Sequence, residues 1–96
     1  MEVRWTEEAS RLLENTLDYW TERNKSPNYA LKILEQVELV EKSISENPYF
    51  LARFIKKVKL YQRHFFNSKF ALYYDILDEE NVIIIKLFRS NKQEPL

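Results

Sequence analysis

Two segments in the first half of the chain carry apolar residues at the spacing of an amphipathic helix. In the first, one face of the expected helix is apolar and the other is charged; the apolar positions are Ala9, Leu12, Leu13, Leu17 and Trp20. Thr6 precedes two glutamates, a pattern typical of an N-cap followed by acids that the helix dipole favours. We therefore expect a helix after Thr6, followed by a short turn within residues 21–25, which lack apolar side chains.

The second segment begins at Ser26 and Pro27, an N-cap candidate followed by a proline in the first turn, where a missing N–H costs nothing. Its apolar stripe is Tyr29, Ala30, Ile33, Leu34, Val37, Val40 and Ile44. Pro48 disfavours helical geometry in the residue before it, so this helix should end near Asn47. The pattern predicts two antiparallel helices joined by a short turn.

Beyond Pro48 the residues become β-branched and aromatic. Val58 to Phe66 and Lys69 to Leu77 flank the polar pair Asn67-Ser68, which indicates a hairpin. In the second of these strands, alternate residues Phe70, Leu72, Tyr74 and Ile76 form the expected core face, and Tyr73 lies on the other, less buried face. Val82 to Phe88 is almost continuously apolar and predicts a central strand.

These elements predict an α+β fold. An N-terminal short strand, Val3 to Trp5, and a two-helix hairpin should pack on a C-terminal three-stranded antiparallel meander. Ninety-six residues allow one domain, so we expect residues 1–96 to form a single unit.

Charge is distributed unevenly along the chain, although 15 cations and 15 anions cancel overall. Residues 1–50 hold six cations and ten anions, a net charge of −4, whereas residues 51–96 hold nine cations and five anions, a net charge of +4. No acidic residue occurs between Asn47 and Tyr74. A local surplus of this kind can attract a polyanion or an acidic protein, so we expect function to lie in the basic half.

Several functional classes are not expected from this composition. There is no cysteine and only one histidine, which gives no zinc-ligand spacing, and we expect neither a metal nor another cofactor. Charged residues follow the initiating methionine at once, unlike a secretory signal. The longest purely apolar run, Val82 to Ile85, is far shorter than the roughly 20 residues of a membrane span. A cytoplasmic protein without membrane partners is the expectation.

The order of several short motifs resembles the RelE/ParE superfamily of toxins from type II toxin–antitoxin modules. The motifs are Trp5-Thr6-Glu7, Tyr19-Trp20, Ser26 with Tyr29-Ala30, Asn47-Pro48, Arg63-His64-Phe65, the strand Leu72 to Ile76, and Asn91 to Pro95. Similar members carry Arg-(Lys or Arg)-Phe at the position of residues 63–65 and Asn-Arg-Gln-x-Pro at the position of residues 91–95. Lys92 therefore stands where those members have an arginine.

The resemblance implies a growth inhibitor that is neutralised by a cognate antitoxin. Its target would be ribosome-bound mRNA, which such toxins cut, or DNA gyrase, which they trap without cutting. The resemblance and the residue types suggest a surface centred on Arg63, His64, Arg89 and Lys92. For binding the target or the antitoxin, the candidates are Lys59, Arg63, Lys69, Tyr73, Arg89 and Lys92.

Arg63, His64 and Lys92 are also the candidate catalytic residues for RNA cleavage. Imidazole titrates near neutrality and can act as acid or base, while arginine can clamp phosphate oxygens. Two observations count against a nuclease. Ala71 stands where nuclease members place an arginine, and the chain is neutral overall where RNA-cutting members are usually strongly basic. Whether the protein is an enzyme stays open on the sequence alone.

Each candidate also has a purely structural interpretation. His64 can be an ordinary strand residue, and Arg63 and Lys59 can be solvated cations that deter edge-to-edge aggregation. The aromatic residues of 65–74 are more typical of a core than of a base-stacking platform, with Tyr73 as the candidate for stacking. An alternative function is accordingly a catalytically degenerate family member that only binds protein partners.

Overall fold

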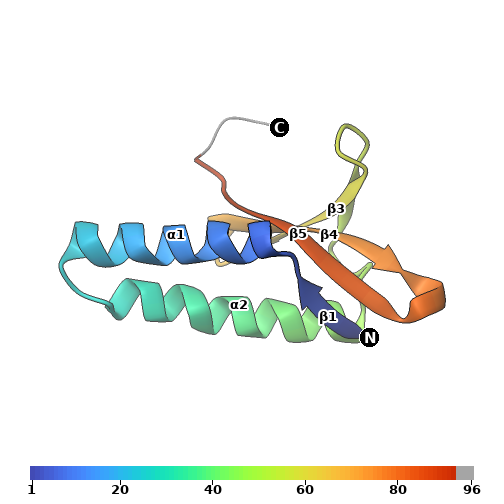
Figure 1. The fold of residues 1–96 in the computed structure, drawn as a ribbon, viewed down its shortest axis with the longest axis horizontal. Coiled ribbons are helices and arrows are strands. Elements are labelled where there is room, and N and C mark those ends of the chain that lie inside the picture. Colours follow the sequence, from blue (N-terminus) through green and yellow to red (C-terminus); the bar gives the residue numbers. More distant parts are fainter. Residues whose placement is uncertain (93–96) are drawn as a thin grey trace.

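The computed structural model describes residues 1–92 and has an α+β fold (Figure 1). A strand and two helices are followed by four further strands and one short 3-10 helix: β1 (Glu2–Trp5), α1 (Glu7–Asn24), α2 (Asn28–Glu46), β2 (Arg53–Ile55), β3 (Leu60–Phe65), β4 (Phe70–Leu77), η1 (Asp78–Glu80) and β5 (Val82–Ser90). Residues 93–95 of the motif Asn91 to Pro95 lie outside the described residues. Within residues 1–92, no helix has the length and apolar character needed to cross a membrane.

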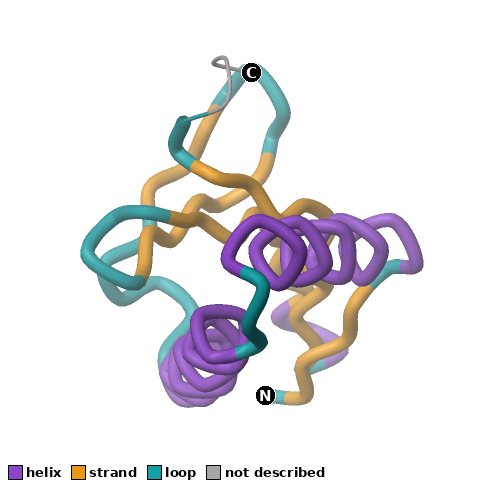
Figure 2. The backbone as a smooth tube through the Cα atoms, turned by 90° about the vertical axis from the view of Figure 1, so that its left-hand side faces the viewer, coloured by secondary structure: helices purple, strands orange, loops and turns teal. Residues whose placement is uncertain are grey.

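The two helices form the expected hairpin, which projects beyond the sheet and gives the molecule extents of 44 × 25 × 25 Å. In Figure 2 the helices are seen nearly end-on in front of the strands. Thr6 caps α1 as predicted, because its Oγ1 accepts a hydrogen bond from the Ala9 amide at 3.1 Å. The helix continues through residues 21–24, where the sequence predicted a turn. Its end is closed by Lys25, which has φ 53°, and by the Ser26 amide, which donates to the Thr21 carbonyl.

Five strands form one mixed sheet in the order β1-β5-β4-β3-β2. β1 runs parallel to β5, and the other neighbours are antiparallel. The predicted three-stranded antiparallel meander is therefore wrong as a description of the sheet: β3, β4 and β5 form such a meander, but β1 and β2 extend it on both sides. β1 confirms the expected N-terminal edge strand. β2 was missed because three residues between a loop and a lysine-rich turn carry no alternating pattern.

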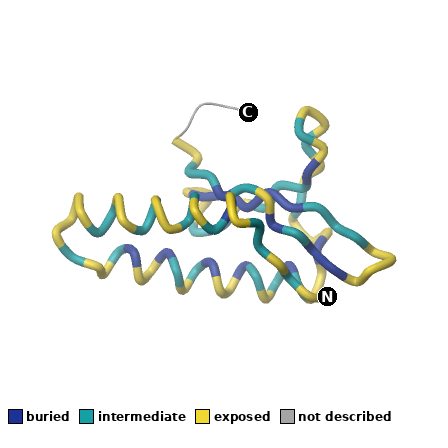
Figure 3. The backbone as a smooth tube through the Cα atoms, in the orientation of Figure 1, coloured by how far each residue is buried: buried dark blue, intermediate teal, exposed yellow. Residues whose placement is uncertain are grey.

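The main core lies between the helices and one face of the sheet (Figure 3). The predicted core face of β4 is confirmed, since Phe70, Leu72 and Tyr74 are buried in this core and Ile76 packs against it. From α2 the core receives Ile33, Val37, Val40 and Ile44, which belong to the predicted apolar stripe. Residues on the same face of β3 and β5 therefore point toward the helices, and alternate residues point away from them.

A second, smaller apolar cluster covers part of the opposite face of the sheet. It consists of Leu60, Ala71 and Tyr73, with Val58 packed against it from the turn between β2 and β3. The expectation that Tyr73 is accessible on the less buried face is wrong, because this cluster leaves the residue only 6% exposed. We call this side of the sheet the open face and define it by His64, Ala71, Tyr73 and Arg89.

Candidate functional site

The predicted site residues do not form one surface. Arg63 faces the helices, His64 and Arg89 lie on the open face, and Lys69 and Lys92 line a groove beside α1. Because successive residues of a strand point to opposite sides, Arg63 and His64 of β3 diverge. The expected single cationic patch of Arg63, His64, Arg89 and Lys92 is therefore wrong.

Arg63 anchors the loop that follows α2 by hydrogen bonds. Its Nη2 donates to Ser43 Oγ in α2 and its Nη1 donates to the Phe50 carbonyl, both at 3.2 Å. The guanidinium also lies over the Phe50 ring, 5.7 Å from its centroid. These partners are neutral, so Arg63 satisfies polar groups of the protein and is not aimed at an external phosphate.

Tyr74 holds the same loop from β4. Its hydroxyl donates to the Pro48 carbonyl at 2.8 Å. Burial raises the pKa of Tyr74 to about 12, an effect that the nearby Arg63 charge partly opposes. Residues 47–52 are thus anchored by two side chains from the sheet.

His64 and Arg89 lie in one row across the open face. Register places His64 opposite Ala71, and Ala71 opposite Arg89. Two strand spacings separate the backbones of β3 and β5, roughly 10 Å. β4 lies between the strands that carry His64 and Arg89. This row is the part of the predicted patch that the fold does bring together.

Asn91 fixes the ring of His64. The side-chain nitrogen of Asn91 donates a hydrogen bond to the Ser68 carbonyl, which can only accept. The same nitrogen lies 3.0 Å from His64 Nδ1. An amide nitrogen cannot accept, so Nδ1 is the acceptor and the neutral ring carries its proton on Nε2. Nε2 of the exposed His64 is therefore a donor suited to an acceptor on a partner, such as a carboxylate or a phosphate.

The remaining two candidates have little chemistry within reach. Lys59 is exposed in the turn between β2 and β3, where it adopts φ 57° and its amide donates to the Ile55 carbonyl at 2.8 Å. Tyr73 is buried, and its hydroxyl accepts a hydrogen bond from Gln62 Nε2 at 2.7 Å. Tyr73 therefore cannot offer its ring for base stacking in this conformation.

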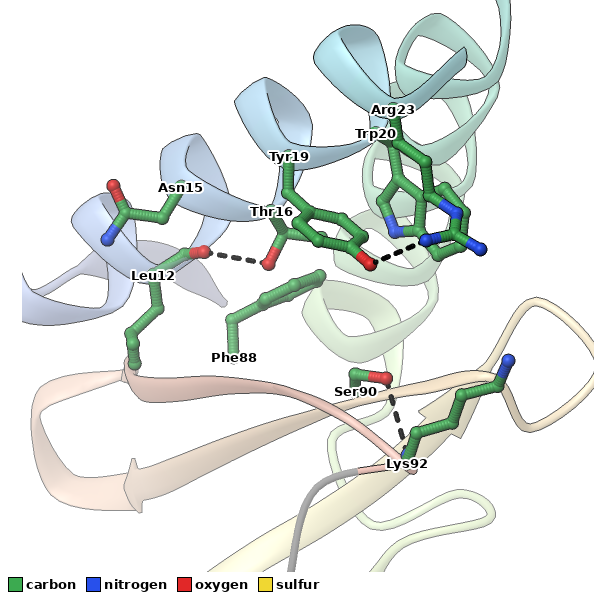
Figure 4. Close-up of a pocket in the computed structure, with 9 residues that line it drawn as sticks. All are labelled: Leu12, Asn15, Thr16, Tyr19, Trp20, Arg23, Phe88, Ser90 and Lys92. Carbon is green, nitrogen blue, oxygen red and sulfur yellow. Dashed lines mark hydrogen bonds between the residues drawn. The ribbon is translucent and has the colours of Figure 1, made fainter.

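A groove that the sequence did not reveal runs between α1 and the ends of β4 and β5 (Figure 4). It consists of two adjoining hollows of about 470 and 530 Å³ that share Trp20, Ser90 and Lys92. The further lining residues are Leu12, Asn15, Thr16, Tyr19, Arg23, Asn24, Tyr29, Ser68, Lys69, Phe70, Phe88 and Asn91. We call it the Trp20 groove. None of the described residues that line it is acidic, although α1 as a whole carries several acids.

A second unpredicted feature is an exposed apolar strip beside β2, the end strand of the sheet. Tyr49, Phe50, Leu51 and Phe54 form this strip, with exposed fractions between 48% and 71%. Leu51 adopts φ 54°, a conformation that is uncommon for a residue other than glycine. Tyr49 is held by a 2.6 Å hydrogen bond to Asp78 Oδ2, which raises the pKa of its hydroxyl to about 12.

The sequence contains residues that belong to the Trp20 groove and to the apolar strip beside β2, but it does not group them. Tyr19, Trp20 and Arg23 recur at spacings that place them along one side of a helix, and Tyr29 comes soon after the turn. On the sequence alone they indicate only a helix, because which sheet edge faces α1 depends on the topology. The strip at residues 49–54 is apolar without any periodicity, so it predicted no element.

Comparison with known proteins adds no identification: no family model, curated protein or solved structure matches the chain. Among the described residues, no group of three or more His, Asp and Glu side chains could hold a metal ion.

Proposed function

We propose that the protein is the growth-inhibiting toxin of a type II toxin–antitoxin module, and that it blocks its target by binding without cutting RNA. The ordered motifs that resemble RelE/ParE toxins support the first part of this proposal. The second part is carried by one observation, the separation of Arg63 and His64 on opposite faces of the sheet.

Metal-free RNA cleavage needs an acid, a base and cations around one phosphate. The guanidinium of Arg63 is engaged by Ser43 and Phe50 beneath α2. His64 lies on the open face, and Lys92 lines the Trp20 groove on the helix side. Arg63 and His64 cannot converge on one phosphate without rearrangement of β3, so binding is favoured over cleavage.

Of the two targets that the resemblance implies, inhibition without cleavage favours DNA gyrase over ribosome-bound mRNA. The open face supplies the contact surface in this proposal, with the Nε2 proton of His64 and the guanidinium of Arg89 as its polar groups. The absence of acidic residues between Asn47 and Tyr74 favours an acidic partner surface.

The apolar strip beside β2 supports the expectation of an antitoxin. An edge strand with unpaired backbone groups can accept an added strand from a partner. Leu51 and Phe54 offer apolar contacts there, and the exposed Arg53 and Lys56 offer cations. We infer that the antitoxin supplies an extended segment with apolar and acidic residues.

The test is induction of the gene in bacteria, alone and together with its neighbouring gene. We expect growth to stop in the first case and to continue in the second, because the antitoxin occupies the toxin. Equal growth in both cases, with folded protein accumulating, contradicts the proposal. Codon-positioned mRNA ends that appear on translating ribosomes after induction contradict the binding mechanism.

A double variant sharpens the same experiment. His64→Ala with Arg89→Ala should relieve growth inhibition, because both polar groups of the row on the open face are removed. Lys32→Ala with Lys42→Ala removes two exposed cations of α2, so it should remain toxic. If the open-face variant is as toxic as the control, the contact surface lies elsewhere and this part of the proposal is wrong.

A further inference from the structure

The Trp20 groove lies on the helix side of the sheet, whereas the row of His64 and Arg89 lies on the open face; Asn91, which lines the groove and contacts His64 Nδ1, stands where the two sides meet. The pairing of β4 with β5 shows the two sides. Phe70 pairs with Ser90, and both residues line the groove. The next pair, Ala71 and Arg89, points to the opposite side of the sheet and belongs to the open face. The two surfaces meet at Asn91 but lie on different sides of the sheet, and an inference drawn from the groove does not rest on the proposed function.

Aromatic rings form one wall of the groove. Trp20 packs edge-on against Tyr19 at 5.2 Å and against Tyr29 at 4.9 Å between ring centroids. Tyr19 is 54% exposed and faces the groove from α1 (Figure 4). The exposed Tyr19 ring offers an apolar face on which a planar ligand group can stack, and the half-buried Trp20 stands perpendicular beside it.

Three cations surround this wall. Arg23 lies 5.9 Å from the Trp20 ring centroid, and its Nη1 donates to the Tyr19 hydroxyl at 3.3 Å. Lys69 lies over Phe66 at 5.1 Å and over Tyr29 at 5.9 Å. In Figure 4, Lys92 extends from the end of β5 toward the helix side of the groove. Contacts with aromatic rings position the Arg23 and Lys69 side chains but do not neutralise their charges.

The polar groups of the lining complete the chemistry. Asn15, Thr16, Asn24 and Ser90 provide amides and hydroxyls, and none of the described lining residues is a carboxylate. A ligand that combines a planar ring with negative charge matches all of these features. A purely acidic ligand would leave the aromatic wall unused, and a neutral aromatic ligand would leave three cations without a counterpart.

We propose that the Trp20 groove binds a nucleotide unit, with its base stacked on the Tyr19 ring beside Trp20 and its phosphates at Arg23, Lys69 and Lys92. Two hollows in sequence have room for more than one such unit. The same chemistry is presented by a free nucleoside phosphate and by a single strand of nucleic acid, whose bases stack on aromatic side chains and whose phosphates pair with cations.

The experiment uses the full chain and fluorescence from Trp20. A Trp5→Phe variant leaves Trp20 as the remaining tryptophan of the two, and it is titrated with ATP, with the octanucleotides (dT)8 and (rU)8, and with an eight-residue polyglutamate. We expect quenching by ATP or by an octanucleotide, with an affinity that falls as salt is raised. ATP affinity similar to that of the octanucleotides identifies a free nucleotide as the ligand, and much tighter octanucleotide binding identifies a single strand.

Variants in the same background assign the binding to the groove. Lys69→Ala with Lys92→Ala should weaken binding at least tenfold and flatten the salt dependence, because phosphate contacts are removed. Tyr19→Ala should weaken binding by roughly tenfold through the loss of stacking. The control, Lys32→Ala with Lys42→Ala, removes two exposed cations outside the groove and should bind as the parent does.

Three results would overturn this inference. They are the absence of binding by any of the nucleotide probes at about 1 mM, an equal loss of affinity in the control and groove variants, and quenching by polyglutamate alone. None of these results bears on growth inhibition, which is measured independently in cells.

Discussion

Arg63 shows how a residue with a functional appearance can serve the fold. A guanidinium in a basic, aromatic stretch suggests phosphate recognition, but this one donates to Ser43 and to the Phe50 carbonyl. Charged donors that satisfy carbonyl and hydroxyl groups of the protein stabilise a fold more than exposed ion pairs do. His64, the next residue, has the opposite character, because it is exposed and lies on the other face of the sheet.

Arg63→Ala should therefore lower the free energy of unfolding by about 1.5 kcal/mol, through the loss of two charged hydrogen bonds. Arg53→Ala removes an exposed strand cation and should change it by less than about 0.5 kcal/mol. Urea denaturation followed by circular dichroism measures both. An Arg63→Ala protein as stable as the parent but no longer toxic would mean that Arg63 contacts the target.

Among the elements, the loop 47–52 depends on the sheet to a degree that its own sequence does not indicate. Backbone turns within it join Phe50 to Asn47 and Ala52 to Tyr49. Its place over β3 and β4 is fixed by Arg63 and by the Tyr74 hydroxyl. The exposed strip beside β2 is carried by this loop, so its geometry follows from the two anchors.

Tyr74 should make the stability of this region sensitive to alkaline pH. The pKa of Tyr74 is raised from 10 to about 12 in the folded protein, so folding favours the neutral hydroxyl. Its contribution is complete below pH 10 and is lost as pH rises through about 12, an effect on the order of 2 kcal/mol. Urea denaturation at pH 8 and pH 11.5 measures this loss.

The comparison proteins for that measurement are two phenylalanine variants. Tyr74→Phe should lose about 1 kcal/mol at pH 8, because the hydrogen bond to Pro48 is missing, and should then fall less steeply with pH than the parent. Tyr49→Phe keeps the Tyr74 hydroxyl, so its free energy of unfolding should still fall steeply at alkaline pH because of that group. An equally steep fall in Tyr74→Phe would show that other groups cause the alkaline loss.

The sequence predicted the elements whose apolar pattern extends over many residues, and it missed the element whose segment is short. Both helices follow from their apolar stripes, and β4 follows from the alternation at Phe70, Leu72 and Tyr74. α1 continues to Asn24 because its end is closed by the left-handed Lys25 and by the Ser26 amide, which composition does not encode. β2 spans three residues and is recognisable only by its pairing with β3.

On the scale of the whole molecule, the charge segregation along the chain does not become one charged face. The basic residues of the second half are distributed over the helix side, the open face and the turn after β2. Arg23 of the acidic half joins Lys69 and Lys92 in the Trp20 groove. The predicted meander gives the strand order β5-β4-β3, but a site built across elements also depends on which part of the sheet faces α1, which the sequence does not encode. The residue types of the candidate site could be predicted, but their grouping could not.

The central claim is that this protein inhibits by binding its target without cleavage, and the supercoiling activity of purified DNA gyrase tests it most directly. Relaxed plasmid, ATP and gyrase are incubated with increasing amounts of the protein, and with the His64→Ala, Arg89→Ala double variant as the matched control. We predict that supercoiling is lost when the protein is in modest excess over gyrase, and that the double variant leaves it intact. Full supercoiling in the presence of a large excess of folded protein would contradict the claim.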